Sequence, residues 1–357
     1  MKKLALKFTA FILAIAVAIV PVSIAVDPYN VFHVNAPRDN GIESNKGFIK
    51  TEYIKKHHDE FDSLLFGSSR AGFVDIAYLN EKTGGRFYDM ASSECLVSEQ
   101  TAELKELIKA GFIPKRVWVL VDDISCFVDP KLHENMLYRV PYPTGGPIDK
   151  AEFYLKYCDL ITVIDSISVI EENKVKKQAD ASSGIDNSYD NSTHMSYLDR
   201  YYHTGTERLD KISQFDPNEE QYQKGYWVDY YNLRTDEAIE DMFRMVKLCK
   251  EYDIELTVLT NPLYHLTYKQ AVDNGYLSYL ASLYSVTDFY NFSSLSDVTC
   301  DYKYYYETSH FTPEVTRMMI DSVTGSTDEH LLSQGFGLHV DVNNAAGFVA
   351  LLESQVR

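Results

Sequence analysis

The chain has 357 residues, of which 45% are hydrophobic, so it can bury the core of one large domain or of two. Its 34 basic and 52 acidic side chains give a formal net charge of −18. This charge argues against nucleic-acid binding, which needs a basic face, and against electrostatic attraction to acidic lipids, so any membrane contact must be hydrophobic. The five cysteines are far apart and include no Cys-x-x-Cys pair, which argues against a zinc knuckle or a thioredoxin-like site, and their odd number argues against a disulfide framework.

The N-terminus carries a membrane-targeting pattern. Three lysines among the first seven residues precede a nearly uninterrupted apolar segment, residues 8–26. At 1.5 Å per residue, a helix of this length crosses roughly 28 Å of hydrocarbon, and lysines in front of it predict an N-terminus inside the cytoplasm. We expect residues 1–26 to be a retained single-pass anchor in the cytoplasmic membrane. A cleaved signal peptide is the alternative, because Ser23-Ile24-Ala25 resembles a small-x-small cleavage site; both interpretations place the folded part outside the cell.

Strand and helix patterns alternate along the rest of the chain. Residues 27–50 form a juxtamembrane linker by composition, and residues 51–357 are expected to form one α/β domain. The expected strands are residues 63–66, 86–91, 116–121, 255–260 and 287–292, and the expected helices are 51–62, 74–81, 97–110, 151–174, 235–252 and one that begins with Thr312-Pro313. Their order predicts a five-stranded parallel sheet of flavodoxin-like winding. The polar stretch around residues 178–224 is expected to be an insertion, either a substrate-facing lid or a surface excursion.

A Gly-Ser-Ser turn ends the first expected strand. The segment Ser63-Leu64-Leu65-Phe66-Gly67-Ser68-Ser69-Arg70 is an apolar run followed by two hydroxyls. Ligands bind outside the carboxyl ends of parallel strands, so these hydroxyls lie where chemistry is expected. Ser69 is the candidate nucleophile and Ser68 the reserve. Arg70 is a candidate for binding an anionic substrate group, with a structural ion pair as the alternative.

A candidate base lies near the C-terminus. His310 immediately precedes the helix start at Thr312-Pro313, and Glu307 is three residues earlier. This offset lets the carboxylate reach the imidazole Nδ1 and leaves the other ring nitrogen free to accept a serine proton.

The two motifs, in this order, resemble the SGNH/GDSL hydrolase superfamily. Together with Asp27-Pro28-Tyr29 after the apolar segment, they resemble more narrowly its membrane-anchored branch, which includes the lipoteichoic-acid D-alanylation protein and alginate O-acetyltransferases. The resemblance implies an SGNH three-layer sandwich with Ser69 as nucleophile, His310 as base and Glu307 as orienting acid. It also implies an oxyanion hole built from the backbone N–H of Ser69 and from the turn that contains Ser92 and Ser93.

Two departures from this family pattern concern the site. The usual acid is Asp, and Glu307 is one methylene longer. The usual side-chain oxyanion donor is an Asn after the third strand, where this chain has Asp122-Asp123; an ionised Asp cannot donate, and one lost donor costs about 2.7–4 kcal/mol of barrier. Asn261, at the end of the fourth strand, is the candidate substitute, and a simple turn residue before Pro262 is the alternative.

The expected function is an extracytoplasmic serine acyl-esterase or O-acyltransferase that acts on a cell-envelope polysaccharide or a teichoic-acid-like polymer. No metal or organic cofactor is expected. The main alternative is an inactive protein of the same fold that binds an envelope glycan or assists a membrane-bound O-acyltransferase. A third possibility is a membrane-anchored adhesin whose 27 tyrosines stack on sugars, although tyrosines are also ordinary core and interface residues.

Overall fold

The computed structural model describes residues 18–35, 42–133, 135–182, 216–219, 223–225, 233–326 and 328–357, with Leu4, Lys7 and the pairs 189–190 and 195–196. Much of the expected anchor, residues 8–17 above all, and most of the expected insertion at 178–224 lie outside the described residues. The described part of the anchor, residues 18–26, is helical. Among the described helices, none combines the length and the apolar character that a membrane-spanning helix needs.

A mixed six-stranded sheet lies at the centre of the α/β fold, in the order β2-β1-β3-β6-β7-β8. The first five strands in this order run parallel, and β8 pairs antiparallel with β7. The five expected strands are present, but the expectation of a purely parallel five-stranded sheet is wrong, because the chain adds an antiparallel edge strand. The strands are β1 (Ser63–Phe66), β2 (Phe87–Asp89), β3 (Arg116–Val121), β6 (Glu255–Thr260), β7 (Phe289–Asn291) and β8 (Leu338–Val340). A separate antiparallel pair joins β4 (Tyr189–Asp190) to β5 (Met195–Ser196).

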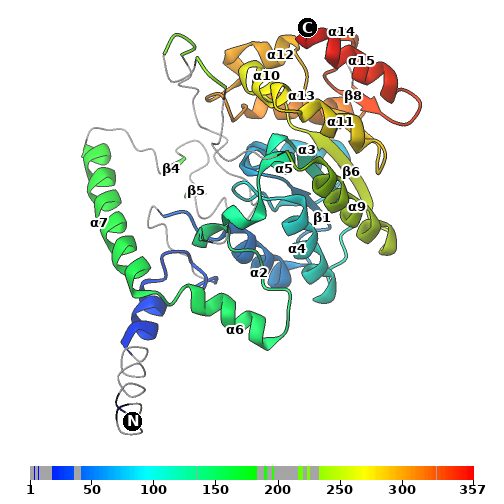
Figure 1. Ribbon diagram of the computed structural model, residues 1–357. Coiled ribbons are helices and arrows are strands. Elements are labelled where there is room, and N and C mark those ends of the chain that lie inside the picture. The colour runs from blue at the N-terminus through cyan, green and yellow to red at the C-terminus, as the bar shows by residue number, and fades with distance from the viewer. Residues whose placement is uncertain are drawn as a thin grey trace.

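Helices cover both faces of the sheet. The longer ones are α2 (Lys46–His57), α3 (Ile76–Thr83), α4 (Val97–Lys109), α6 (Pro147–Lys156), α7 (Leu160–Ser182), α9 (Thr235–Glu251), α10 (His265–Asp273), α11 (Tyr276–Leu283), α13 (Pro313–Val323) and α15 (Ala345–Val356). Shorter ones are α5 (Asp123–Phe127), α12 (Asp297–Cys300) and α14 (Glu329–Ser333). Figure 1 shows α4 and α9 together on one face of the sheet.

Two apolar cores explain why the central strands are apolar without alternation. In β3, Val117 and Val119 pack into the core with α4, α9 and α11, whereas Trp118 and Leu120 pack into the core with α3 and α13. A strand whose two faces are both buried needs a continuous apolar run, since successive side chains point to opposite faces.

The strand order determines where the candidate site lies in the fold. The chain passes from β1 to β2 on one side and then returns to β3 on the other, so the order reverses between β1 and β3. Ligands of open α/β sheets bind at such a switch point, outside the carboxyl ends of the strands. Ser68 and Ser69 follow β1 there, and Asp122 follows β3.

The linker and the region after β3 pack on each other. One helix was expected at 151–174, but the chain forms two, α6 and α7, with a break at residues 157–159. Phe48 of α2 and Phe153 of α6 join Val31 and Tyr157 in a third apolar cluster. In Figure 1, α6 runs along the lower edge of the domain and α7 stands at its side.

Candidate active site

The turn after β1 carries the candidate nucleophile. Gly67 has no room for a side chain, because an added Cβ would lie 2.5 Å from the Cβ of Ala71. Ser68 then caps the short 3-10 helix η1 (Ser69–Phe73), in which Ser69 is the first residue. Ser69 is half-buried, so its hydroxyl lies at the end of a buried strand and still reaches solvent.

The loop at residues 304–312 carries the candidate base, His310, and is fixed by hydrogen bonds. The Tyr306 N–H donates to the His310 carbonyl at 2.8 Å, which closes the loop on itself. The Thr267 hydroxyl of α10 donates to the Thr308 carbonyl at 2.5 Å, a buried contact that fixes the loop to the domain. The loop therefore holds its imidazole at a defined position above the sheet edge.

Ser69, His310 and Glu307 form a continuous hydrogen-bonded chain. The Ser69 Oγ lies 2.9 Å from His310 Nε2, and His310 Nδ1 is hydrogen-bonded to Glu307 Oε1. Glu307 also accepts the backbone N–H groups of Ser309 at 2.6 Å and His310 at 2.9 Å. A neutral imidazole that donates from Nδ1 to Glu307 leaves Nε2 as the acceptor for the Ser69 proton. The side chains of His310 and Glu307 are 25% and 26% exposed, so a substrate can approach them.

The electrostatics of the loop keep Glu307 ionised. Burial raises the pKa of this carboxyl, but the hydrogen bond and charge of His310 outweigh burial, with further help from the Ser309 N–H and the charge of Arg70. The net result is a pKa of Glu307 below its ordinary value. An anionic Glu307 stabilises the imidazolium that forms when His310 takes a proton.

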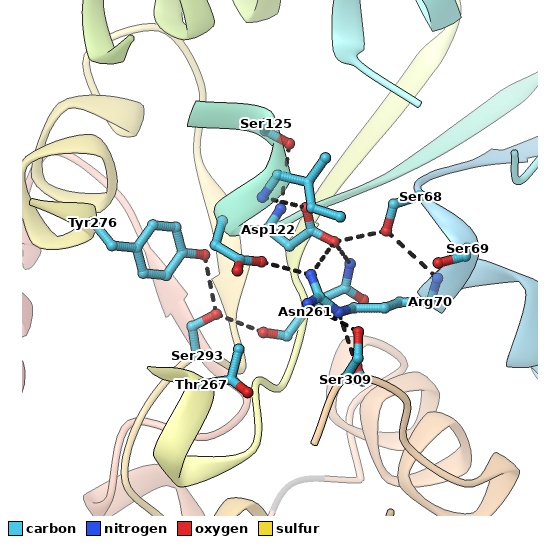
Figure 2. Close-up of polar contacts among 12 residues, drawn as sticks. Ser68, Ser69, Arg70, Asp122, Ser125, Asn261, Thr267, Tyr276, Ser293 and Ser309 are labelled. Carbon is cyan, nitrogen blue, oxygen red and sulfur yellow. Dashed lines mark hydrogen bonds and ion pairs between the residues drawn. The ribbon is translucent and has the colours of Figure 1, made fainter. Parts of the chain in front are cut away.

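Arg70 lies behind the nucleophile and is fully buried. Its Nη1 is 2.6 Å from Asp123 Oδ1 and 2.8 Å from Asp122 Oδ2. Its Nε donates to the Ser309 carbonyl at 2.9 Å, and its Nη2 donates to the Ser309 hydroxyl at 3.3 Å. Figure 2 shows the guanidinium between the Asp122 carboxylate and Ser309. The expectation of an open anion-binding side chain is therefore corrected: Arg70 forms the alternative structural ion pair, and it fastens the residue next to His310.

Burial and ion pairing have opposite effects on the pKa values of this buried cluster. Burial lowers the pKa of Arg70, but Asp123 and Asp122 outweigh burial and raise it, so the guanidinium stays protonated. Burial raises the pKa of Asp123 and dominates the opposing charge of Arg70. Removing the cation would leave two carboxylates in the interior.

Asp122 is the hub of this network. Its Oδ2 accepts the Ser68 hydroxyl at 2.7 Å and the Asn261 amide at 3.0 Å, in addition to pairing with Arg70. Ser68, the reserve nucleophile, therefore donates its hydroxyl hydrogen bond to the Asp122 carboxylate (Figure 2), whereas the Ser69 Oγ contacts the imidazole of His310. Asn261 is fully buried, and its amide N–H supports Asp122.

Ser92 and Ser93, in the turn after β2, were both expected to help form the oxyanion hole, but they make different contacts. The Ser92 N–H donates to the Gly67 carbonyl at 3.3 Å, which seats the turn beside the nucleophile but engages this donor. The Ser93 hydroxyl is hydrogen-bonded to Glu43 of the linker. Within the described residues, the backbone N–H groups of Ser69 and Ser93 donate no hydrogen bond, in contrast to the N–H of Ser92.

A buried lysine supports the same turn. Lys50 of α2 is 1% exposed, and its Nζ donates to the Ala91 carbonyl at 2.7 Å. Glu103 of α4 is buried nearby; burial and the charge of Glu99 outweigh that of Lys50 and raise the pKa of Glu103 to about 8. Burial therefore favours the neutral form of this carboxyl.

No group of three or more potential metal ligands occurs in the described part of the chain. All five cysteines are unpaired.

Comparison with known proteins gives no match: neither a protein-family model nor a curated protein sequence matches the chain. The assignment of chemistry therefore depends on the geometry of the site and on the resemblance of its two motifs.

Sequence reasoning missed two contributions, the pairing of Arg70 with Asp122-Asp123 and the contact of Lys50 with Ala91. The first had a usable signal, because opposite charges that follow β1 and β3 meet at one sheet edge. The second had none, since Lys50 was expected at the end of the linker, whereas in the structure it belongs to α2, which begins at Lys46.

Proposed function

We propose that the protein is an extracytoplasmic serine acyl-esterase or O-acyltransferase that acts on a cell-envelope polymer. The observation that carries this proposal is the Ser69–His310–Glu307 chain, with 2.9 Å between Ser69 Oγ and His310 Nε2. A hydroxyl in hydrogen-bond reach of a base that is itself oriented by a carboxylate is the arrangement that activates serine nucleophiles.

The reaction proceeds in two halves. Ser69 Oγ attacks the ester carbonyl while its proton moves to His310 Nε2, and the carbonyl oxygen becomes an oxyanion. The tetrahedral intermediate collapses, the C–O bond to the leaving alcohol breaks, and His310 returns the proton to that alcohol, which leaves an acyl-serine. Water then attacks in an esterase, or an acceptor hydroxyl attacks in a transferase, with His310 taking the proton of the attacking group and passing it to Ser69.

The fold and location complete the proposal. We assign the chain to the SGNH-like α/β hydrolases, supported by the Gly67-Ser68-Ser69 turn after β1, the Glu307-x-x-His310 loop, and five parallel strands in the order β2-β1-β3-β6-β7. The apolar segment 8–26 would anchor the protein in the cytoplasmic membrane. An O-acetylated polysaccharide or a teichoic acid fits that location as the substrate, and a membrane-bound O-acyltransferase fits it as a partner.

A second candidate is a protein of the same fold that binds an envelope glycan without turnover. The observation that favours it is that two expected oxyanion donors are already engaged, the Ser92 N–H with Gly67 and the Asn261 amide with Asp122. In this case the site would lack the side-chain donor that strengthens many acyl-transfer enzymes.

The test compares adjacent serines in the full chain, purified in mild detergent. We expect the unmutated protein to hydrolyse an activated acetyl ester and to form a covalent adduct with a serine-reactive phosphonate, mapped to Ser69 by mass spectrometry. Ser69→Ala should remove the adduct and lower hydrolysis by about 10³-fold or more. The matched control Ser68→Ala should keep the adduct at Ser69. A protein that shows neither reaction but binds a glycan would instead be the non-catalytic candidate.

A further inference from the structure

The helices α6 and α7 expose an unusual amount of apolar surface. Nine of the eighteen large hydrophobic side chains that are exposed in the described part of the chain fall within residues 148–175. Ile148 is 76% exposed, Leu155 64% and Ile161 70%. Single exposed apolar residues are normal, but a concentration of them marks a surface that something covers.

Six of these nine side chains lie along α6 or in the first two turns of α7. We define the α6–α7 apolar surface as Ile148, Tyr154, Leu155, Leu160, Ile161 and Ile164. Leu160 and Ile164 are four residues apart and share one face of α7, and Ile161 flanks them. The domain buries few side chains of these helices: Phe153 is the only buried residue of α6, and Val163 and Ser166 are buried in α7.

The apolar N-terminal helix joins the domain beside this surface. The helical residues 18–26 end at Asp27, whose buried carboxylate accepts the N–H groups of Val31, Phe32 and His33 at 2.7–3.0 Å. This turn fixes the direction of the chain at the exit from the helix.

Aromatic contacts then fasten the exit to α6. The Phe32 ring stacks on Tyr154 at 5.5 Å, and the Tyr29 ring lies 5.7 Å from Tyr157 at the end of α6. Asn45 donates to the Tyr157 hydroxyl at 2.7 Å, which ties the linker to the same point. Figure 1 shows the N-terminal helix meeting the domain at the junction of α6 and α7, with α6 along the lower edge.

We propose that the α6–α7 apolar surface docks on the lipid bilayer next to the N-terminal helix and fixes the orientation of the domain on the membrane. The inference extends the proposed function, because it depends on segment 8–26 entering the membrane. We choose the lipid bilayer as the binding partner of this surface, because the apolar helix and the apolar surface are adjacent and are joined by a fixed turn. Lys150 and Lys156 of α6 are offset by Asp149 and Glu152, and the whole chain carries −18, so the contact is apolar rather than electrostatic.

The test places a tryptophan on the surface of the full chain. Leu155→Trp and Ile161→Trp are reconstituted in phosphatidylcholine vesicles with or without lipid brominated along its acyl chains. Val342→Trp, a site 74% exposed between β8 and α15, is the matched control. Subtracting the emission of the unmutated chain removes the contribution of the two native tryptophans.

We expect brominated lipid to quench the added emission at positions 155 and 161 by about twofold and to leave position 342 unchanged, in low and in high salt alike. Equal quenching at all three positions, or none, would overturn the proposal. Emission at 155 that changes only on dilution would indicate a second copy as the occupant and would also overturn it. Phosphonate labelling of Ser69 is measured on the same samples. The quenching tests membrane docking and the labelling tests the proposed esterase, so either proposal can fail without the other.

Discussion

Replacing the buried Arg70 by Met should destabilise the protein far more than replacing an exposed arginine would. Its guanidinium makes two ion pairs, to Asp123 at 2.6 Å and to Asp122 at 2.8 Å, and two hydrogen bonds to Ser309, all with no exposed surface. Removing one partner of a buried ion pair costs about 3–5 kcal/mol because it leaves uncompensated charge in the interior. A typical domain has only about 5–15 kcal/mol of stability, so this is a large fraction.

Urea unfolding of the full chain, followed by the emission of the buried Trp118, measures this cost. With an m-value of about 3 kcal/mol/M, the midpoint of Arg70→Met should fall by roughly 1–1.7 M. Arg317→Met is the matched control. Arg317 also pairs with a carboxylate, that of Asp75 at 2.6 Å, but its own side chain is 55% exposed, so its loss should cost less than about 1 kcal/mol.

The destabilisation should depend on pH in a defined direction. The pKa of Asp123 is already raised by burial, and losing Arg70 removes the charge that opposes this shift. A carboxyl whose pKa is higher in the folded than in the unfolded state costs stability as pH rises through that interval. The gap between Arg70→Met and the unmutated protein should therefore widen from pH 5 to pH 8. A gap that is constant, or that widens in acid, would refute this account of the buried charges.

The same substitution tests how the base is positioned. Arg70 fastens Ser309 through two hydrogen bonds, and Ser309 precedes His310 in the chain. Phosphonate labelling at Ser69 should therefore slow in Arg70→Met under conditions where the variant is still folded. Arg70→Lys should recover part of the stability through its charge but little of the labelling rate, because one ammonium cannot replace the planar fork. A labelling rate in Arg70→Met equal to that of the unmutated protein would show that the contacts of Arg70 with Ser309 have no part in activity.

Three further predictions concern the residues around the triad. Glu307→Gln should lower ester hydrolysis by about 10²–10⁴-fold with the His310 loop still folded, since an amide cannot stabilise the imidazolium; steady-state kinetics with a circular-dichroism control checks this, and unchanged kinetics would exclude the role. Glu103→Gln should become more stable relative to the unmutated protein by about 1 kcal/mol per pH unit between pH 5 and 8. The reason is that a native pKa of about 8 makes the unmutated protein lose stability as pH rises. Urea unfolding of both proteins at each pH measures the difference, and curves that coincide at every pH would contradict the prediction. Lys50→Met should cost about 1–3 kcal/mol by leaving the Ala91 carbonyl without this donor and should lower kcat more than it changes KM; an unfolding midpoint equal to that of the unmutated protein would argue against the contact.

The central sheet was predictable because its strands are apolar on both faces. Residues 116–121 are a continuous apolar run after Arg116, and the observed β3 has the same bounds. β8 was not predictable in this way. It has three residues, of which only Val340 is buried, and its antiparallel position at the sheet edge needs no long apolar run.

The meeting of Ser69 and His310 was predictable from topology, whereas the environment behind them was not. A nucleophile after the first strand and a base just before α13 converge at the switch point of a parallel sheet, and the structure brings their side chains to 2.9 Å. The strand order brings Arg70 to the same sheet edge as Asp122 and Asp123, but it does not tell which carboxylate oxygens turn toward the guanidinium. Asp122 and Asp123 were therefore interpreted as a defect of the oxyanion hole when they are the counter-ions of a buried cation.

That reassignment changes what the site needs in order to work. An ionised Asp122 facing a developing oxyanion would oppose catalysis, but its Oδ2 is already occupied by Ser68, Asn261 and Arg70. The carboxylate therefore acts on the scaffold, where it fixes the turn that carries Ser69. In the proposed mechanism, with the Asn261 amide bonded to Asp122, backbone N–H groups would stabilise the oxyanion, and those of Ser69 and Ser93 donate no hydrogen bond within the described residues. Backbone donors are only as effective as the turns that hold them, and this is why the buried contacts of Arg70 and Lys50 belong to the chemistry of the site.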